Sequence, residues 1–204
     1  MTESGEFGSY YKGLWGGKIF RFLDYAKVCL VRKVLSGKRI PLRVVDLGCG
    51  SGAIALSIAE SVRGVEITCV DDNPALLDLA RNRGLKVCRS NLNERLPFGD
   101  DSTDIVLMVD SIEHVESRKQ IFAETKRILT DKGLIIIFTP PYDTITWCIG
   151  EKAHRLLTHR NAGHISPFTK ESLEWLLSMN FSEWNLGYLN CGLTMYGVGM
   201  CKKE

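Results

Sequence analysis

Two kinds of apolar pattern alternate along the chain between residues 43 and 139. Short runs rich in Val, Ile and Leu are each followed by a segment with apolar residues at three- and four-residue intervals. This alternation predicts a parallel sheet covered by helices on both faces. The predicted strands are 43–47, 65–70, 86–89, 104–109 and 134–139, and the predicted helices are 52–62, 74–83 and 117–129. Within the last strand, Leu134–Phe138 contains no polar residue, so we expect it to be buried on both sides.

Further elements are predicted before and after this block. A helix over 18–35 has an apolar row that places three basic residues on the solvent side. The row is Ile19, Leu23, Ala26, Leu30 and Val34, and the basic residues are Lys27, Arg32 and Lys33. A helix over 169–179, capped by Thr169, precedes two strands over 181–189 and 194–201 that form an antiparallel hairpin. The fold class is therefore α/β, a doubly wound, mostly parallel sheet with a C-terminal hairpin.

Length and composition favour one domain. With 204 residues, 45% of them hydrophobic, the chain can bury one ordinary core. We expect a flexible arm over 1–17 and a single domain over 18–204. The longest apolar runs are too short to span a membrane, and no signal peptide is recognisable. Seven cysteines without a C-x-x-C pair favour a reducing cytoplasm over a disulfide framework or structural zinc.

The net charge of +2 does not by itself indicate nucleic-acid binding, but it is unevenly distributed. Residues 1–43 hold nine Lys/Arg against three Asp/Glu, a net +6, which leaves −4 for the remainder. The basic segment is either a solvated helix face or a surface that meets an anionic substrate or membrane.

A glycine-rich turn follows the first predicted strand, in the sequence VVDLGCGSG over Val44–Gly52. Gly48 and Gly50 can take positive φ and let a ligand lie against the backbone, and Gly52 lets the next helix start close to the strand. Free N–H groups at that helix start can bind a carboxylate or phosphate. The same residues, with Ala53, also fit the G-x-G-x-x-A pattern of dinucleotide sites, so the glycines alone do not select the ligand.

Asp46, two positions before the first glycine, distinguishes between these ligands. A carboxylate there would repel a pyrophosphate but suits the sulfonium and ammonium groups of S-adenosylmethionine. The alternative role for Asp46 is a loop cap.

The second predicted strand ends at Asp71-Asp72, and Asp71 lies 23 residues after Gly48. A carboxylate at this place can accept hydrogen bonds from both ribose hydroxyls. Asp71, directly after the strand, is the preferred ribose ligand, and Asp72 turns toward the loop or caps the next helix. This feature is common to methyltransferases and dehydrogenases.

Over about residues 40–180, the chain resembles the class I, Rossmann-like S-adenosylmethionine-dependent methyltransferases, especially the small-molecule type of the ubiquinone-biosynthesis group. The resemblance rests on five motifs. These are VVDLGCGSG, VDDNPALLDLAR, LPFGDDSTDIVLMVDSIEHV, LTDKGLIIIFTPP and GHISPFTKESLEWLL.

The resemblance implies a set of cofactor-binding residues. Asp71 would hold the ribose, Asn91 and Leu92 would cover adenine, and Val109, Asp110 and Ser111 would lie beside the methionine arm. Asn91 departs from the Asp of many relatives but still offers an acceptor oxygen. The remaining candidates are Asp46, Gly48, Cys49, Gly50, Gly52, Asp72 and, on an N-terminal segment that would fold over the cofactor as a lid, Tyr11 and Trp15.

Catalytic groups are harder to identify, because methyl transfer depends mainly on alignment and needs a base only when the acceptor must lose a proton. The candidates are His114 and His164; packing at a helix start is the alternative for His114. The five-residue spacing of His154, His159 and His164 puts them on different helix faces, so no metal site is expected. TPPY over 139–142 follows the fifth strand rather than the fourth, which disfavours the amino-group methylation motif it resembles. The insert over 140–168 would shape the acceptor pocket.

The leading hypothesis is methyl transfer from S-adenosylmethionine to a small or medium organic acceptor, at O, N or C, releasing S-adenosylhomocysteine. The first alternative is a noncatalytic protein that binds S-adenosylmethionine and serves as a partner or regulator. An NAD-dependent oxidoreductase is disfavoured by Asp46, and nucleic-acid methylation is a minor alternative. The expected partner is thus a small molecule, with no stable nucleic acid and no transmembrane segment.

Overall fold

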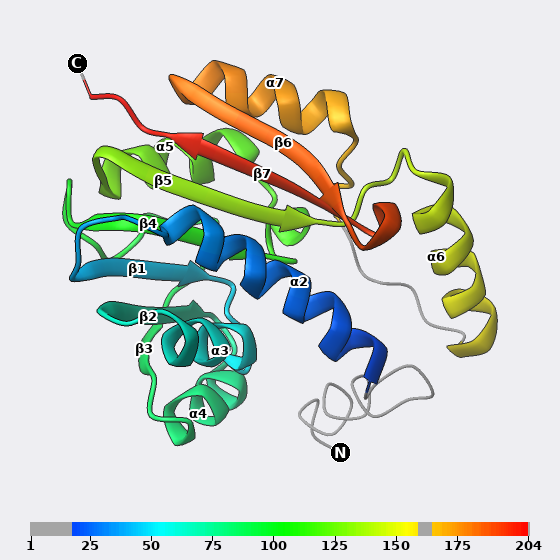
Figure 1. Ribbon diagram of the computed structural model, residues 1–204, viewed down its shortest axis with the longest axis horizontal. Helices are drawn as coiled ribbons and strands as arrows, with labels where there is room; N and C mark the ends of the chain where they lie inside the picture. Colours follow the sequence, from blue (N-terminus) through cyan, green and yellow to red (C-terminus); the bar gives the residue numbers. More distant parts are fainter. Residues whose placement is uncertain (1–17, 159–164, 204) are drawn as a thin grey trace.

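A mixed β-sheet forms the centre of the computed structural model, which describes residues 18–158 and 165–203 (Figure 1). In these two segments, seven strands lie in the order β3-β2-β1-β4-β5-β7-β6. Neighbouring strands from β3 to β5 run parallel, whereas β7 runs antiparallel to both β5 and β6. The predicted doubly wound, mostly parallel sheet with a C-terminal hairpin is therefore confirmed.

The strands are β1 (Leu42–Leu47), β2 (Val65–Asp71), β3 (Lys86–Arg89), β4 (Thr103–Val109), β5 (Leu129–Thr139), β6 (Glu183–Leu189) and β7 (Thr194–Met200). The α-helices are α2 (Lys18–Leu35), α3 (Ala53–Ser61), α4 (Pro74–Asn82), α5 (Arg118–Ile128), α6 (Ile145–Thr158) and α7 (Lys170–Asn180). Short 3-10 turns, η1 (Ile112–His114) and η2 (Asn190–Gly192), follow β4 and β6. The predicted arm or lid over 1–17 lies outside the described residues.

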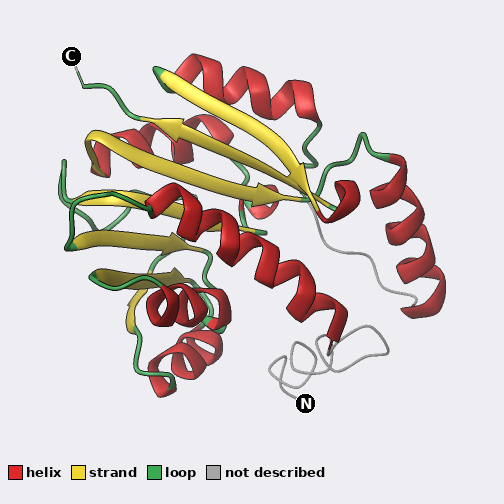
Figure 2. Ribbon diagram, in the orientation of Figure 1, coloured by secondary structure: helices red, strands yellow, loops and turns green. Residues whose placement is uncertain are grey.

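Helices cover both faces of the sheet (Figure 2), and β5 shows why. Ile135 and Ile137 pack with the residues of α5 and α7, whereas Ile136 and Phe138 pack with those of α2 and α3. Successive side chains of a strand point to opposite faces, so a strand covered on both sides needs apolar residues throughout. The whole of Leu134–Phe138 is buried, as its sequence predicted.

Helix α2 packs against the sheet through a different face from the predicted one. The predicted row from Leu23 to Val34 is only half-buried. The buried residues of this helix are Lys27, Val28, Val31 and Leu35. Placing Lys27 on the solvent side was therefore wrong. Lysine is rarely buried without a partner, and this one has a carboxylate partner, Asp110, directly after β4 that the helix sequence could not reveal.

The insert between β5 and α7 contains helix α6, which the apolar pattern did not predict. This helix lies beyond the carboxyl ends of the parallel strands, away from the helix layers (Figure 1). Its Ile145, Ile149 and Leu156 side chains are exposed, so its apolar spacing does not reflect a core contact. On another face of α6, the Trp147 ring lies 5.8 Å from that of Tyr142. No helix within the described residues is long and apolar enough to cross a membrane.

Arg127, at the end of α5, holds the long connection between β3 and β4. Its guanidinium donates hydrogen bonds to the backbone oxygens of Leu96 (3.0 Å) and Phe98 (2.8 Å) and forms an ion pair with Glu124 (2.6 Å). Glu124 in turn accepts a hydrogen bond from the Leu96 N–H at 2.9 Å. Because the Arg127 side chain is only 18% exposed, these bonds are shielded from water and should stabilise the fold.

We predict that Arg127→Met lowers the free energy of unfolding by about 2–4 kcal/mol, because backbone acceptors and a carboxylate lose a charged donor. Arg81→Met is the matched control, since Arg81 pairs with Asp78 on an exposed surface and should change stability by less than ~0.5 kcal/mol. Urea denaturation measures both variants. Equal stability of the two variants would contradict the bracing role.

Candidate active site

The strand order reverses between β1 and β4, and this point of the sheet positions the candidate site. In open α/β sheets, the crevice outside the carboxyl ends at such a reversal is where ligands bind. β1 leads into the glycine turn before α3, and β4 leads into η1. The two strand ends are tied together directly, because the Ser111 hydroxyl donates a hydrogen bond to the Leu47 carbonyl at 2.7 Å.

The glycine turn needs its glycines for two different reasons. Gly48 and Gly50 both have positive φ, at 77° and 54°. A Cβ at Gly48 would lie 2.4 Å from the Ser111 Cβ, so this position is closed by the protein's own packing. A Cβ at Gly50 would meet nothing within 4 Å. Of these two residues, Gly50 is the one with open space beside its backbone.

Asp71 connects the end of β2 to this turn. One carboxylate oxygen accepts a hydrogen bond from the Gly50 N–H at 2.9 Å, and the other accepts one from the Asn73 N–H at 3.0 Å. Each oxygen retains acceptor capacity beyond these bonds. Asp72 is exposed and does not cap helix α4, because Asn73 does so by accepting from the Ala75 N–H. Of the two roles expected for Asp72, capping was therefore wrong.

Asp46 is buried beneath the turn, with 2% of its surface exposed. Its Oδ1 has no hydrogen-bond partner among the described residues. Burial, together with the nearby negative charge of Asp71, raises the pKa of Asp46 to about 7. A buried carboxyl with an unpartnered oxygen is costly, and a cationic or hydrogen-bond-donating ligand would relieve that cost. This orphaned oxygen fits a cofactor that carries positive charge.

The other residues expected around the cofactor lie on the neighbouring loops. Leu92 is half-buried, and its Cδ1 lies 3.7 Å from the position a Cβ would take on Gly48. Asn91 is exposed, and its side-chain oxygen accepts a hydrogen bond from the Asn93 N–H at 2.9 Å, so that oxygen already stabilises the loop. Val109, at the end of β4, is half-buried, and the Cys49 thiol donates to the Gly50 carbonyl at 3.4 Å.

Asp110 follows β4 in the left-handed backbone region, with φ 49°. Its N–H donates to the Phe138 carbonyl at the end of β5, at 2.9 Å. Its carboxylate accepts a hydrogen bond from the buried ammonium group of Lys27 on α2. The Lys27 Nζ also lies 3.5 Å from Asp24 Oδ1. Helix α2 is thus attached by an ion pair to the site's edge.

Glu113, in η1, is fully buried beside this ion pair. Burial, with the charge of Asp110 second, raises the pKa of Glu113 to about 8, although a hydrogen bond from the Thr139 hydroxyl (3.1 Å) opposes the shift. Its backbone carbonyl accepts from the N–H groups of Ile165 (3.0 Å) and Ser166 (2.9 Å), at the end of the insert. Glu113 therefore joins η1, β5 and the returning insert.

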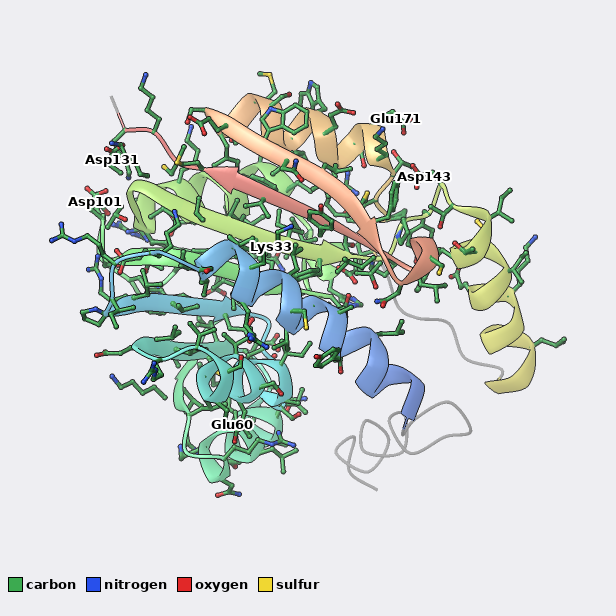
Figure 3. The ribbon with its side chains drawn as sticks, viewed as in Figure 1. Lys33, Glu60, Asp101, Asp131, Asp143 and Glu171 are labelled. Atoms are coloured by element: carbon green, nitrogen blue, oxygen red, sulfur yellow. The ribbon has the colours of Figure 1, made fainter. Side chains whose placement is uncertain are left out.

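The beginning of the insert is attached near the start of α7. Asp143 accepts a hydrogen bond from the Lys170 N–H at 2.8 Å, and Figure 3 shows Asp143 and Glu171 on neighbouring segments. Burial is the main cause that raises the pKa of Tyr142 to about 12, followed by the charges of Glu151 and Glu113. Tyr142 is therefore neutral at physiological pH, and its ring packs near Trp147 of helix α6.

The structure brings most, but not all, of the predicted site residues to this edge. His114 is exposed in η1, where its N–H donates to the Ser111 carbonyl at 3.1 Å. Tyr11, Trp15 and His164 lie outside the described residues, and their roles stay predictions. The metal prediction rests on histidines whose side chains are not described either.

Sequence reasoning missed Lys27 and Glu113 as site residues. Lys27 carried a signal, because it lies one helical turn before Val31 and so shares a face with an apolar residue. Glu113 carried none, because residues 110–114 are mostly polar. A charged residue on an apolar helix face indicates a buried partner.

A separate hollow lies near the amino ends of the strands and includes Arg43, Glu66 and Lys86 in its lining. Arg43 is paired with Asp104 at 2.8 Å, and Lys86 with Glu66 at 3.4 Å. The charged residues of this hollow are already paired with one another or with Asp104. In open α/β sheets, ligands bind outside the carboxyl ends of the strands rather than the amino ends, so we place the candidate site at the carboxyl edge.

The chain is similar in sequence to known methyltransferases. Residues 45–137 match the family model described as a methyltransferase domain. Over 98 residues, the chain is 35% identical to malonyl-[acyl-carrier protein] O-methyltransferase of Geobacter sulfurreducens. This match covers 46% of this chain and 37% of that enzyme. Over 108 residues, it is 35% identical to demethylmenaquinone methyltransferase of Deinococcus radiodurans, covering 50% of this chain and 45% of that enzyme. The chain thus spans less than half the length of these relatives.

Solved structures share the fold over nearly the whole chain. A Thermotoga maritima protein, described as an S-adenosylmethionine-dependent methyltransferase and possible histamine N-methyltransferase, superposes with a TM-score of 0.77 at 23% identity, over 97% of each chain. The resemblance to class I methyltransferases is therefore confirmed. The domain match and the fold imply S-adenosylmethionine as the cofactor.

We predict that Gly48→Ala lowers the free energy of unfolding by about 2–4 kcal/mol. A Cβ there both strains the left-handed backbone and overlaps Ser111. Gly50→Ala carries the backbone strain without the overlap and should cost about 1–2 kcal/mol. Thermal and urea unfolding of the two variants measures the difference. A Gly50 variant as unstable as the Gly48 variant would show that Ser111 is not the constraint.

Proposed function

We propose that the protein transfers the methyl group of S-adenosylmethionine to a small or medium organic acceptor and releases S-adenosylhomocysteine. The observation that carries this proposal is the buried Asp46 carboxyl with an unpartnered oxygen beneath the glycine turn. A pyrophosphate would place like charge beside that group, whereas a sulfonium or ammonium complements it. The match of residues 45–137 to a methyltransferase domain supports the same ligand.

Different residues of the chain would bind different parts of S-adenosylmethionine. Gly50 offers bare backbone, Asp71 offers carboxylate oxygens to the ribose, and Leu92 offers an apolar surface to the adenine. Asp46 provides negative charge near the turn, and residues 109–111 flank the methionine arm. The bound cofactor supplies a methyl group on a positively charged sulfur. Alignment of that group with the acceptor then accounts for most of the catalysis.

The acceptor side is formed by η1, the end of β5 and the insert. Tyr142 and Trp147 offer aromatic surface there, and the buried Glu113 carboxyl offers a proton-transfer group whose pKa, about 8, suits an acceptor that must lose a proton. Relatives act on acceptors as different as a malonyl-acyl carrier protein and demethylmenaquinone, judging from their names. We infer a small-molecule acceptor, no stable nucleic-acid partner and a cytoplasmic location.

Isothermal titration calorimetry with S-adenosylhomocysteine, S-adenosylmethionine and NAD tests the proposal. We expect binding of the first two and none of NAD. NAD binding without S-adenosylhomocysteine binding would overturn it. Cofactor binding without methyl transfer to a broad panel of acceptors would instead favour a noncatalytic binding protein.

Asp71→Asn should weaken S-adenosylhomocysteine binding at least tenfold, or about 1.4 kcal/mol. An amide can accept only at its oxygen, so it cannot hold the N–H groups of Gly50 and Asn73 and also serve two ribose hydroxyls. Asp78→Asn, on the exposed side of α4, is the control and should bind like the parent chain. Parent-like affinity of the Asp71 variant would remove that residue from the cofactor site.

The Asp46 carboxyl should make cofactor binding depend on pH. Its pKa is raised to about 7 without ligand, and a cationic ligand favours its ionised form. Below pH 7, binding must therefore release a proton, and affinity should rise by roughly tenfold between pH 5.5 and 7. Asp46→Asn should abolish that rise, while Asp78→Asn keeps it. Calorimetry in buffers of different ionisation enthalpy measures the proton release; no release by the parent chain would contradict the assignment.

A further inference from the structure

Among the Lys and Arg residues whose side chains the structure describes, Lys27 alone is buried, with 4% of its surface exposed. It comes from α2, a helix that otherwise packs on the sheet through Val28, Val31 and Leu35. Its ammonium donates to the Asp110 carboxylate and lies 3.5 Å from the Asp24 carboxylate. Such a placement costs desolvation and is maintained only when the charge has specific partners.

The charge of Lys27 is retained in spite of burial. Burial by itself lowers the pKa of a lysine, but the carboxylates of Asp110 and Asp24 more than offset this and raise the pKa of Lys27 above its usual value. Lys27 is therefore an ammonium at any physiological pH, and it faces Asp110 and Asp24 directly and Glu113 at longer range. The Asp110 side chain is 45% exposed, so the ion pair leaves part of it accessible.

Asp110 is held in place from two directions. Its left-handed backbone is fixed by the hydrogen bond to the Phe138 carbonyl, and its carboxylate is fixed by Lys27. Such a backbone is uncommon outside glycine and persists where its surroundings determine it. The backbone of Asp110 is thus held by β5, and its carboxylate is held by a helix distant in sequence.

In methyl transfer, an electron pair of the acceptor would form the new bond to the methyl carbon while the S–CH3 bond breaks and its electron pair stays on sulfur. A sulfonium would thus become a neutral thioether. A free carboxylate beside the sulfonium would stabilise the charged reactant more than a transition state in which that charge is already dispersed, which slows the reaction. A carboxylate already paired with an ammonium has this effect to a much smaller degree.

We propose that Lys27 is a positioning residue for methyl transfer: it holds and neutralises Asp110, so that the site binds S-adenosylmethionine without over-stabilising its sulfonium. This inference rests on the proposed function, because it assumes that residues 109–111 lie beside the methionine arm. It also assigns a role in catalysis to α2, which lies outside the segment matched by the methyltransferase family model.

The test compares the affinities of S-adenosylmethionine and S-adenosylhomocysteine, which differ by the sulfonium charge, in Lys27→Met. Methionine preserves the length and apolar contacts of lysine but removes its charge. We expect the preference for S-adenosylmethionine over S-adenosylhomocysteine to rise about threefold to tenfold. In turnover, kcat and the KM for S-adenosylmethionine should both fall. A merely structural role would weaken both ligands equally.

Further variants keep the test decisive. Asp110→Asn removes the carboxylate nearest the site and leaves the Lys27 ammonium with Asp24 alone, so it should shift the preference in the opposite direction, and Lys27→Met combined with Asp110→Asn should return it toward the parent value. Lys33→Met, an exposed lysine of the same helix labelled in Figure 3, is the control and should leave the preference unchanged. If Lys27→Met does not fold, the Asp110→Asn arm and charge-preserving Lys27→Arg, expected to match the parent, decide the question.

An unchanged preference in folded Lys27→Met, or in Asp110→Asn when the first variant does not fold, would overturn this inference alone. Binding of neither ligand by the parent chain would overturn the proposed function and this inference together. Calorimetry therefore separates the two failures before any activity is measured.

Discussion

The close approach of β1 and β4 at their carboxyl ends is the constraint on which the candidate site depends. Ser111 bonds to the Leu47 carbonyl at 2.7 Å and fills the space beside Gly48, so the glycine turn and the end of β4 are placed as one unit. Asp71 then attaches the end of β2 to the same turn through Gly50. Parallel strands all have their carboxyl ends at the same edge of the sheet. The loops that follow β1, β2 and β4 therefore meet at that edge.

Charge is distributed unevenly around this junction. On one side of the glycine turn, Asp46 is buried without a partner for one oxygen, and Asp71 raises its pKa further. On the other side, Asp110 is paired with a buried ammonium. The Asp46 carboxyl can therefore offer negative charge to a cationic ligand, whereas the negative charge of Asp110 is largely neutralised by Lys27. Both arrangements suit the proposed methyl transfer, in which a sulfonium would be bound and then converted into a neutral thioether.

The fold was largely predictable from the sequence, and the cofactor roles of the residues near the strand ends stay predictions. Leu134–Phe138 has no polar residue because both faces of β5 are covered, and the strand-helix alternation specified a parallel sheet before any contact was known. The spacing of apolar residues did not predict a helix that packs away from the core. Helix α6 exposes Ile145 and Ile149, so its pattern carried no recognisable stripe. The roles of His114 and of the insert in binding an acceptor stay predictions.

The sequence by itself determined the alternation of strands and helices over residues 43–139, the C-terminal hairpin, and the acidic and glycine residues at or just after the ends of β1 and β2, because periodicity and turn chemistry act between near neighbours in the chain. Only the tertiary structure decided which face of α2 is buried and what Asp110 binds. Lys27 and Asp110 are 83 positions apart in the sequence. A helical lysine is therefore expected to be exposed, and only a contact with a distant carboxylate offsets the desolvation cost of burying it. The same holds for Gly48, whose need for glycine comes from Ser111 on another strand's end rather than from its own turn alone.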